Sequence, residues 1–149
     1  MHSVLRSALV ALVALLIPVV TLGGPPGDTL GIGPKIGERI PQAVDLPDQT
    51  GDLRSLLSLA GERGLVLLFY RSLEMCPPCE LHMRKWNEHA GALNSLGYGV
   101  ATITNDSVES LARVTQRSDA TVPLLSDRKA RVIKAFGLLD ERYPPGSAW

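Results

Sequence analysis

The chain has 149 residues, enough for one domain with a substantial hydrophobic core. Its 15 basic and 15 acidic residues give a formal net charge of zero. Because no basic stretch or acidic tail stands out, the composition argues against a nucleic-acid or polyanion partner.

The first 23 residues are typical of an export signal. Residues 1–7 carry one Arg and no acid, residues 8–20 are apolar throughout, and small side chains precede a plausible cleavage point after Gly23. The apolar run is shorter than the ~20 residues of a comfortable membrane span. We therefore expect residues 1–23 to be a cleaved signal peptide, with an anchor that contacts the membrane as the alternative. Either places the domain in the periplasm or cell envelope, where disulfides persist.

Beyond this segment the sequence predicts a linker and one folded domain. Residues 24–36 are rich in Gly and Pro, which predicts a linker, and the domain is expected to cover residues 37–149. A turn is predicted over residues 48–52 and a short helix over residues 53–60. The continuous apolar run at residues 65–70 predicts a strand buried on both faces of an α/β sheet.

Two further strands are predicted, at residues 98–104 and 122–125. Pro123 places the second at a sheet edge, because proline cannot donate a ladder hydrogen bond. Asp106 is predicted to cap the helix between them, with Glu109 completing a capping box. The inward-facing residues of that helix are expected to be Leu111 and Val114.

A last helix is predicted over residues 128–136, capped by Asp127 and ended by Gly137. Its expected buried face consists of Val132, Ile133 and Phe136. The alternation of strands and helices predicts right-handed crossovers and a mainly parallel central sheet flanked by helices, an α/β fold.

The only two cysteines lie at the start of a helix, in the sequence Cys76-Pro77-Pro78-Cys79. Because Pro78 disfavours helical geometry at Pro77, we predict that the helix begins at Pro78 and that Pro77 lies just outside it. The free N–H groups and partial positive charge of a helix N-terminus stabilise a thiolate. Cys76 is therefore the predicted nucleophile, with the N–H groups of Cys79 and Glu80 as donors to its sulfur.

Cys79 begins an apolar stripe on this helix, which is expected to end near Leu96. The stripe recurs every three or four residues: Cys79, Met83, Trp86, Ala90 and Leu93. We expect Cys79 to face the core and Cys76 to be exposed, so that Cys79 resolves a mixed disulfide formed on Cys76. The charge of Arg71 is expected to support the site, and that of Glu74 to oppose it.

Two other interpretations of the cysteine pair stay open. The pair could form an inert bridge, although closing so short a loop stabilises little. With His82 it could bind copper or zinc, although there is no second cysteine pair. The dithiol interpretation requires neither a metal nor a cofactor, and it leaves His82, Lys85 and His89 as a solvated polar face.

Two segments carry a family resemblance. Leu65-Val66-Leu67-Leu68-Phe69-Tyr70-Arg71 precedes the cysteines, and Val122-Pro123-Leu124-Leu125-Ser126-Asp127 precedes an apolar stretch that ends at Gly137. Both resemble segments of the redoxin (alkyl hydroperoxide reductase/thiol-specific antioxidant) family of the thioredoxin-like superfamily. The resemblance covers about residues 37–139 and implies a thioredoxin-like fold.

The chain departs from that family at the site. Peroxiredoxins carry a Pro-x-x-x-Thr-x-x-Cys signature, whereas Phe69 and Leu73 occupy the Pro and Thr positions here and Ser72 is one place off. Cys-Pro-Pro-Cys is instead similar to the motif of envelope thiol–disulfide oxidoreductases. Thioredoxin-like folds also continue with a cis-proline, a β-hairpin and a last helix. We expect an incomplete domain in which residues 65–70 become an apolar edge strand.

The sequence therefore predicts an exported thiol–disulfide oxidoreductase that exchanges its dithiol with protein thiols and disulfides. A thiol-dependent peroxidase acting on peroxide, with a separate reductant protein as partner, is the first alternative. A copper-binding carrier is the second.

Overall fold

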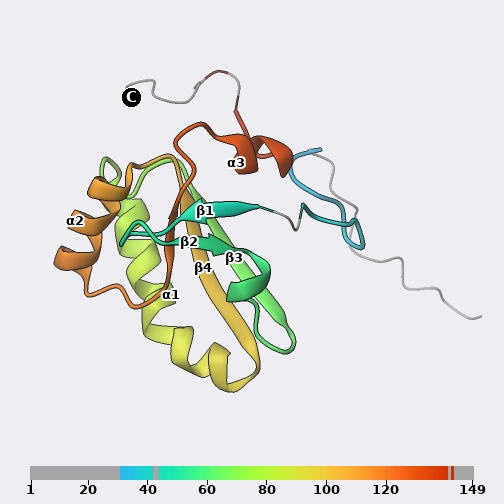
Figure 1. The fold of residues 1–149 in the computed structure, drawn as a ribbon, viewed down its shortest axis with the longest axis horizontal. Coiled ribbons are helices and arrows are strands. Elements are labelled where there is room, and N and C mark those ends of the chain that lie inside the picture. Colours follow the sequence, from blue (N-terminus) through green and yellow to red (C-terminus); the bar gives the residue numbers. More distant parts are fainter. Residues whose placement is uncertain (1–30, 42–43, 141, 143–149) are drawn as a thin grey trace, which may run out of the picture.

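The computed structural model describes residues 31–41, 44–140 and 142. The elements in chain order are β1 (Asp45–Pro47), β2 (Leu53–Ser55), the 3-10 helix η1 (Leu57–Leu59), β3 (Gly64–Tyr70), α1 (Pro77–Ser95), β4 (Tyr98–Thr104), α2 (Val108–Ser118), β5 (Leu124–Ser126) and α3 (Arg131–Ala135) (Figure 1). The predicted signal or anchor at residues 1–23 and the tail at residues 143–149 lie outside the described residues. Residues 31–36 of the predicted linker contain neither helix nor strand.

A parallel sheet with the order β3-β4-β5 forms the centre of the fold. The register pairs Gly64 with Tyr98 and Tyr70 with Thr104, so β3 and β4 run side by side over their whole length. β5 begins one residue after Pro123 and pairs with β4 alone within the described residues. The predicted parallel α/β architecture is confirmed, as is the edge position of β5.

β3 is an edge strand rather than the central, fully buried strand that its apolar sequence predicts. All seven of its residues are half-buried, because β4 is its only partner in the described part of the chain. An apolar edge strand at residues 65–70 was expected, and the described residues show one. The side chains of β3 still alternate between the two faces: Leu65, Leu67 and Phe69 on one, Val66, Leu68 and Tyr70 on the other.

Two hydrophobic cores lie on opposite faces of the sheet, giving three layers (Figure 1). The core under α1 and α2 includes Met83, Leu111, Val114 and Leu124, all fully buried. The opposite core is covered by β1, by the segment around η1 and by α3; its buried members include Leu46, Ile103, Val132, Ile133 and Phe136. The inward faces predicted for the second and third helices are therefore confirmed.

The predicted helix at residues 53–60 is wrong. The carboxylate of Asp48 accepts hydrogen bonds from Thr50 N, Thr50 Oγ1, Asp52 N and Arg54 Nε, at 2.6 to 3.2 Å. These bonds close the turn and bring β2 back onto β1 as an antiparallel pair. Because residues 53–55 pair with β1, only η1 is helical within the predicted segment.

α3 begins later than predicted. Ala130 adopts the left-handed conformation, with φ of 49°, so the helix is Arg131–Ala135 instead of residues 128–136. Asp127 still caps it, because its carboxylate accepts the N–H groups of Arg131, Val132 and Ile133 at 2.8 to 2.9 Å. Gly137, with φ of 66°, follows its end as predicted.

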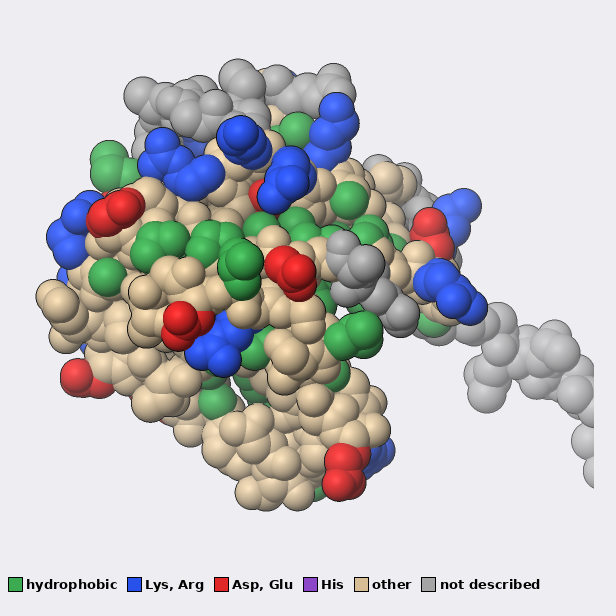
Figure 2. Space-filling model, in the orientation of Figure 1, with side chains coloured by type: hydrophobic (Ala, Val, Ile, Leu, Met, Phe, Trp, Pro, Cys, Tyr) green, Lys and Arg blue, Asp and Glu red, His purple; other side chains and the backbone are tan. Residues whose placement is uncertain are grey.

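Charge is balanced over the chain but uneven on its surface. Figure 2 shows Lys and Arg side chains gathered at the top of one face, near α3. The exposed basic residues of this segment are Arg128, Lys129, Arg131 and Lys134. In the described ranges, none of the helices has the length and apolar character required to cross a membrane.

Candidate redox site

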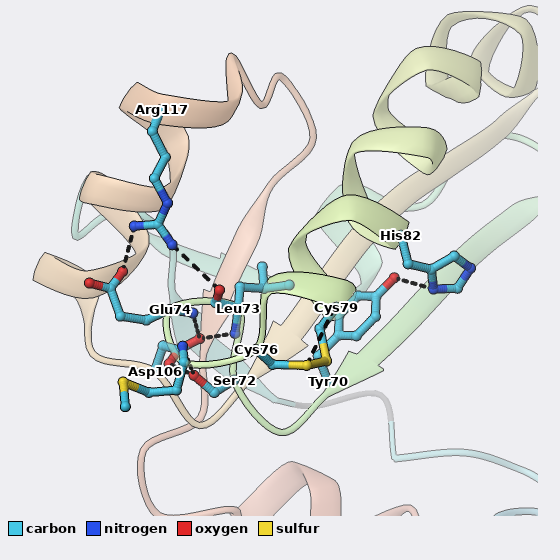
Figure 3. The surroundings of a disulfide bond; sticks show 10 residues. Tyr70, Ser72, Leu73, Glu74, Cys76, Cys79, His82, Asp106 and Arg117 are labelled. Atoms are coloured by element: carbon cyan, nitrogen blue, oxygen red, sulfur yellow. Dashed lines mark hydrogen bonds and ion pairs between the residues drawn. A yellow bond between two sulfur atoms is a disulfide. The ribbon is translucent and has the colours of Figure 1, made fainter.

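Cys76 and Cys79 form a disulfide where the loop after β3 enters α1 (Figure 3). Their Cα atoms are 5.2 Å apart, a normal separation for a bridge. Both residues are half-buried, and Cys79 packs against the core under α1 and α2. The predicted inward orientation of Cys79 is found, whereas Cys76 is less exposed than expected. The two sulfurs can therefore exchange between thiol and disulfide without a large backbone movement.

The helix begins one residue earlier than predicted. α1 starts at Pro77 with Cys76 as the N-cap, so the two prolines occupy the first two helical positions. Neither position needs its N–H for an intrahelical bond, so both tolerate proline. The N–H of Cys79 donates to Cys76 Sγ at 3.3 Å, as predicted. The N–H of Glu80 instead donates to the Cys76 carbonyl oxygen at 3.0 Å. Of the two predicted donors, only the N–H of Cys79 therefore bonds to the sulfur of Cys76.

The stripe predicted for α1 is confirmed except at Trp86. Met83 and Ala90 are buried, and Cys79 and Leu93 pack against the same core. The indole N–H of Trp86 donates to His82 Nε2 at 3.2 Å. Because an indole only donates, His82 Nε2 is an acceptor. The other ring nitrogen of His82, Nδ1, lies 3.0 Å from Tyr70 Oη.

His82, Lys85 and His89 are exposed, as predicted, and His82 also contacts Tyr70 and Trp86. Tyr70 ends β3, and burial raises the pKa of its phenol. Figure 3 shows its ring beside the cysteine pair, with the hydroxyl directed to His82. The sequence pattern assigned Trp86 to the apolar stripe and His82 to the polar face, so their contact was not predicted. The contact of His82 with Tyr70 depends on how α1 packs on β3.

Asp106 is the main support of the cysteine loop, a role that the sequence did not reveal. Its buried carboxylate accepts Ser72 Oγ–H and Leu73 N–H, both at 2.6 Å, and Thr104 Oγ1–H at 3.1 Å. The prediction that Asp106 caps α2 is wrong, because Ser107 is the N-cap and accepts the N–H of Ser110 at 3.2 Å. Asp106 ties the end of β4 to the loop that precedes Cys76.

Ser72 and Leu73 hold the conformation of the loop before Cys76. Ser72 Oγ donates to Asp106 and accepts the N–H of Met75 at 2.9 Å, and Ser72 is buried. Leu73 is fully buried in the core under α1 and α2. Both side chains are therefore used to shape the loop.

An ion-pair network covers the other side of the loop. Arg117 of α2 donates from Nη1 to Glu74 and from Nε to Glu80, each at 2.8 Å, and its Nη2 forms an ion pair with Glu80, also at 2.8 Å. Arg113 also pairs with Glu74 at 3.2 Å, and Arg84 with Glu80 at 2.8 Å. Hydrogen bonds from Arg117 lower the pKa of Glu74. Burial opposes ionisation of Glu80, but the bonds from Arg117 and Arg84 outweigh it and lower its pKa.

Arg71 lies half-buried directly after β3, and its carbonyl oxygen accepts the N–H of Asn105 at 3.2 Å. Hydrogen bonds from Arg142 lower the pKa of Asp140, and the charge of Arg71 adds to that effect. Arg71 also lines a cavity of about 320 Å³ with Phe69, Tyr70, Asn105, Ile133 and residues 138–140. Its predicted support of Cys76 stays a prediction.

The metal interpretation gains no support. Among the described residues, no group of three or more His, Cys, Asp or Glu side chains is placed to hold a metal ion. His82 is bonded through both ring nitrogens to Tyr70 and Trp86.

Comparison with known proteins identifies the family. A model described as "AhpC/TSA family" matches residues 36–147. Peroxiredoxin Bcp of Escherichia coli (strain K12) is 30% identical over 115 residues, which are 77% of this chain and 72% of that protein.

Solved structures show the same fold. Xanthomonas campestris peroxiredoxin Q aligns with a TM-score of 0.62 at 23% identity, covering 68% of this chain and 65% of that one. Peroxidoxin BcpB from Mycobacterium tuberculosis aligns with a TM-score of 0.56 at 31% identity, covering 63% and 60%. The chain thus spans less than two thirds of these solved proteins. The fold is thioredoxin-like, and the chain belongs to the AhpC/TSA family, whose peroxiredoxin members are thiol-dependent oxidoreductases.

Proposed function

We propose that this protein is a thiol-dependent peroxidase in which Cys76 reacts with the peroxide and Cys79 resolves the product. The Cys76 thiolate attacks the terminal peroxide oxygen, the O–O bond breaks, and water or an alcohol leaves once it takes up a proton. The sulfenic acid left on Cys76 then condenses with the Cys79 thiol, forming the disulfide and releasing water. A reductant protein restores both thiols by disulfide exchange.

The observation that carries this proposal is the Cys76–Cys79 bridge at the N-terminus of α1 in a chain whose relatives are peroxiredoxins. The bridge is the product that the second step requires. The N–H of Cys79 on Cys76 Sγ supports Cys76 as the thiolate, because a hydrogen bond to the charged form favours it.

Thiol–disulfide exchange with protein substrates is the second candidate, and the sequence around the cysteines favours it. Leu73 occupies the position of the peroxiredoxin Thr and is fully buried. Met75 and Leu81, which flank the cysteine pair, are exposed apolar side chains, 66% and 60% accessible. An exposed apolar rim suits a polypeptide better than a small peroxide.

Measuring both activities on the same preparation separates the candidates. The peroxidase proposal expects stoichiometric consumption of hydrogen peroxide by the reduced protein and its loss in Cys76→Ser. In Cys79→Ser, a sulfenic acid should accumulate on Cys76, detected by trapping with dimedone and mass spectrometry. Lys85→Gln, which removes an exposed ion pair with Glu88, is the control.

Insulin reduction without peroxide consumption would replace the first candidate by the second. A sulfenic acid on Cys79 instead of Cys76 would reverse the assigned roles.

We also propose that the protein is exported and acts in the periplasm or cell envelope. The support is the sequence of residues 1–23, with a charged start, an apolar stretch and small residues before Gly24. Expression with a C-terminal tag, followed by cell fractionation and N-terminal sequencing, should give a periplasmic protein that begins at Gly24. A cytosolic protein that retains its first residues would contradict export.

A further inference from the structure

Two carboxylates flank the cysteine pair in the sequence. Glu74 is two residues before Cys76, and Glu80 directly follows Cys79. A nearby negative charge disfavours a thiolate. Left uncompensated, both carboxylates would therefore oppose the positive end of α1, where the reactive sulfur lies.

One side chain from a different helix contacts both carboxylates. Arg117, in the last turn of α2, places one part of its guanidinium group on Glu74 and another on Glu80. Its Nη2 also lies 3.5 Å from the carbonyl oxygen of Leu73 in the cysteine loop. Figure 3 shows this residue reaching from α2 to the loop on the side away from Tyr70 and His82.

The cluster as a whole is positive. Its two carboxylates are matched by three guanidinium groups, those of Arg84, Arg113 and Arg117. The two carboxylates are largely shielded, with side chains 22% and 13% accessible. Arg84 contacts one carboxylate and Arg113 the other, so Arg117 is the residue that bridges the two.

We propose that Arg117 is a positioning residue that fixes the cysteine loop to the start of α1 and compensates the negative charge of the two carboxylates that flank the cysteine pair in the sequence. It acts on Cys76 through Glu74 and Glu80, without a reaction step of its own. The inference rests on the proposed redox role of Cys76, whether the substrate is a peroxide or a protein disulfide.

The test measures the thiol itself instead of turnover. Cys79→Ser leaves Cys76 as the only thiol of the chain, so the rate of alkylation by iodoacetamide against pH reports the pKa of Cys76. Arg117→Gln in this background should raise that pKa by on the order of half a unit and slow alkylation at neutral pH about threefold. Failure of either proposed activity would leave this readout intact.

Three further variants separate charge from packing. Glu80→Gln alone should lower the pKa of Cys76, and Glu74→Gln/Glu80→Gln/Arg117→Gln should bring it to the starting value or below. Lys85→Gln removes a positive charge elsewhere on α1 and should leave the profile unchanged.

The opposite results are equally clear. A profile of Arg117→Gln that superimposes on that of the starting protein, even with a lower unfolding free energy, would reduce Arg117 to a structural role. If Arg117→Gln does not fold, Glu80→Gln decides, because an unchanged or raised pKa of Cys76 there contradicts the proposal.

Discussion

Asp106 shows how a single buried carboxylate can hold the loop before the cysteines. It accepts two hydroxyl and two backbone N–H groups, if the longer contact with Glu74 N at 3.5 Å is included. Three of these four donors belong to residues 72–74, a segment with neither helix nor strand. The order of the cysteine loop thus depends on a residue about thirty positions later in the chain.

Asp106→Ala should lower the unfolding free energy by about 2–3 kcal/mol, because buried donors lose a charged acceptor. The matched control is Ser107→Ala, which removes the neighbouring helix cap and should cost about 1 kcal/mol. Urea denaturation of both variants measures the difference. Equal losses would show that the loop does not depend on Asp106.

Asp48 makes the hairpin sensitive to acid. Burial raises the pKa of this carboxyl, but hydrogen bonds from Thr50, Arg54 and Asp52 outweigh it and lower the pKa from 3.8 to about 2. A folded-state pKa below the unfolded one stabilises the protein fully above pH 3.8, and this stability is lost as the pH falls through about 2.

The contribution is about 2 kcal/mol at neutral pH. Unfolding free energies of the starting protein and Asp48→Asn, measured across the acid range, should differ most near neutral pH and converge toward pH 2. A constant difference at every pH would show that ionisation of Asp48 is not what stabilises the turn.

Two glycines show what individual elements tolerate. Gly91 is exposed within α1, and a Cβ there would meet nothing within 4 Å. Gly99 lies in β4, where a Cβ would collide with the backbone carbonyl of Leu59 and approach Gly61 N to 3.2 Å. The helix has room for a side chain, whereas β4 and the turn after η1 depend on its absence.

Gly91→Ala should stabilise the protein by about 0.5–1 kcal/mol, because alanine loses less backbone entropy in a helix. Gly99→Ala should destabilise it by more than about 2 kcal/mol, because backbone must move. Thermal and urea unfolding of the pair measure both signs. A stable Gly99→Ala protein would mean that η1 is not held against β4.

The three layers of the molecule do not depend on the disulfide. The bridge closes a loop of four residues within one layer, whereas the two cores are formed by residues from every element of the fold except β2. A protein that cycles between dithiol and disulfide needs a fold that survives both states.

Reduction, or the double variant Cys76→Ser/Cys79→Ser, should therefore lower the unfolding free energy by at most about 2 kcal/mol. Urea denaturation with and without reductant gives the comparison, and the double variant controls for effects of the reductant. Complete unfolding on reduction would instead support the inert structural bridge.

Local sequence patterns by themselves predicted much of this fold. The apolar runs gave β3 and β4, the three-to-four-residue spacing of apolar side chains gave the buried faces of α1 and α2, and the Cys-Pro-Pro-Cys sequence at a helix start located the site. These are short-range properties, set by strand alternation, helical periodicity and the unpaired N–H groups of a helix N-terminus.

Tertiary structure alone decided what surrounds the cysteines. From its sequence position, Asp106 could cap α2 or accept hydrogen bonds from the loop before Cys76. Because β4 pairs with β3, Asp106 lies beside that loop and binds it. Arg117 has no sequence signal that links it to Glu74 and Glu80, which lie 43 and 37 residues away. Such contacts depend on how α2 packs beside α1, and the energy of that packing is distributed over a whole core instead of any one motif.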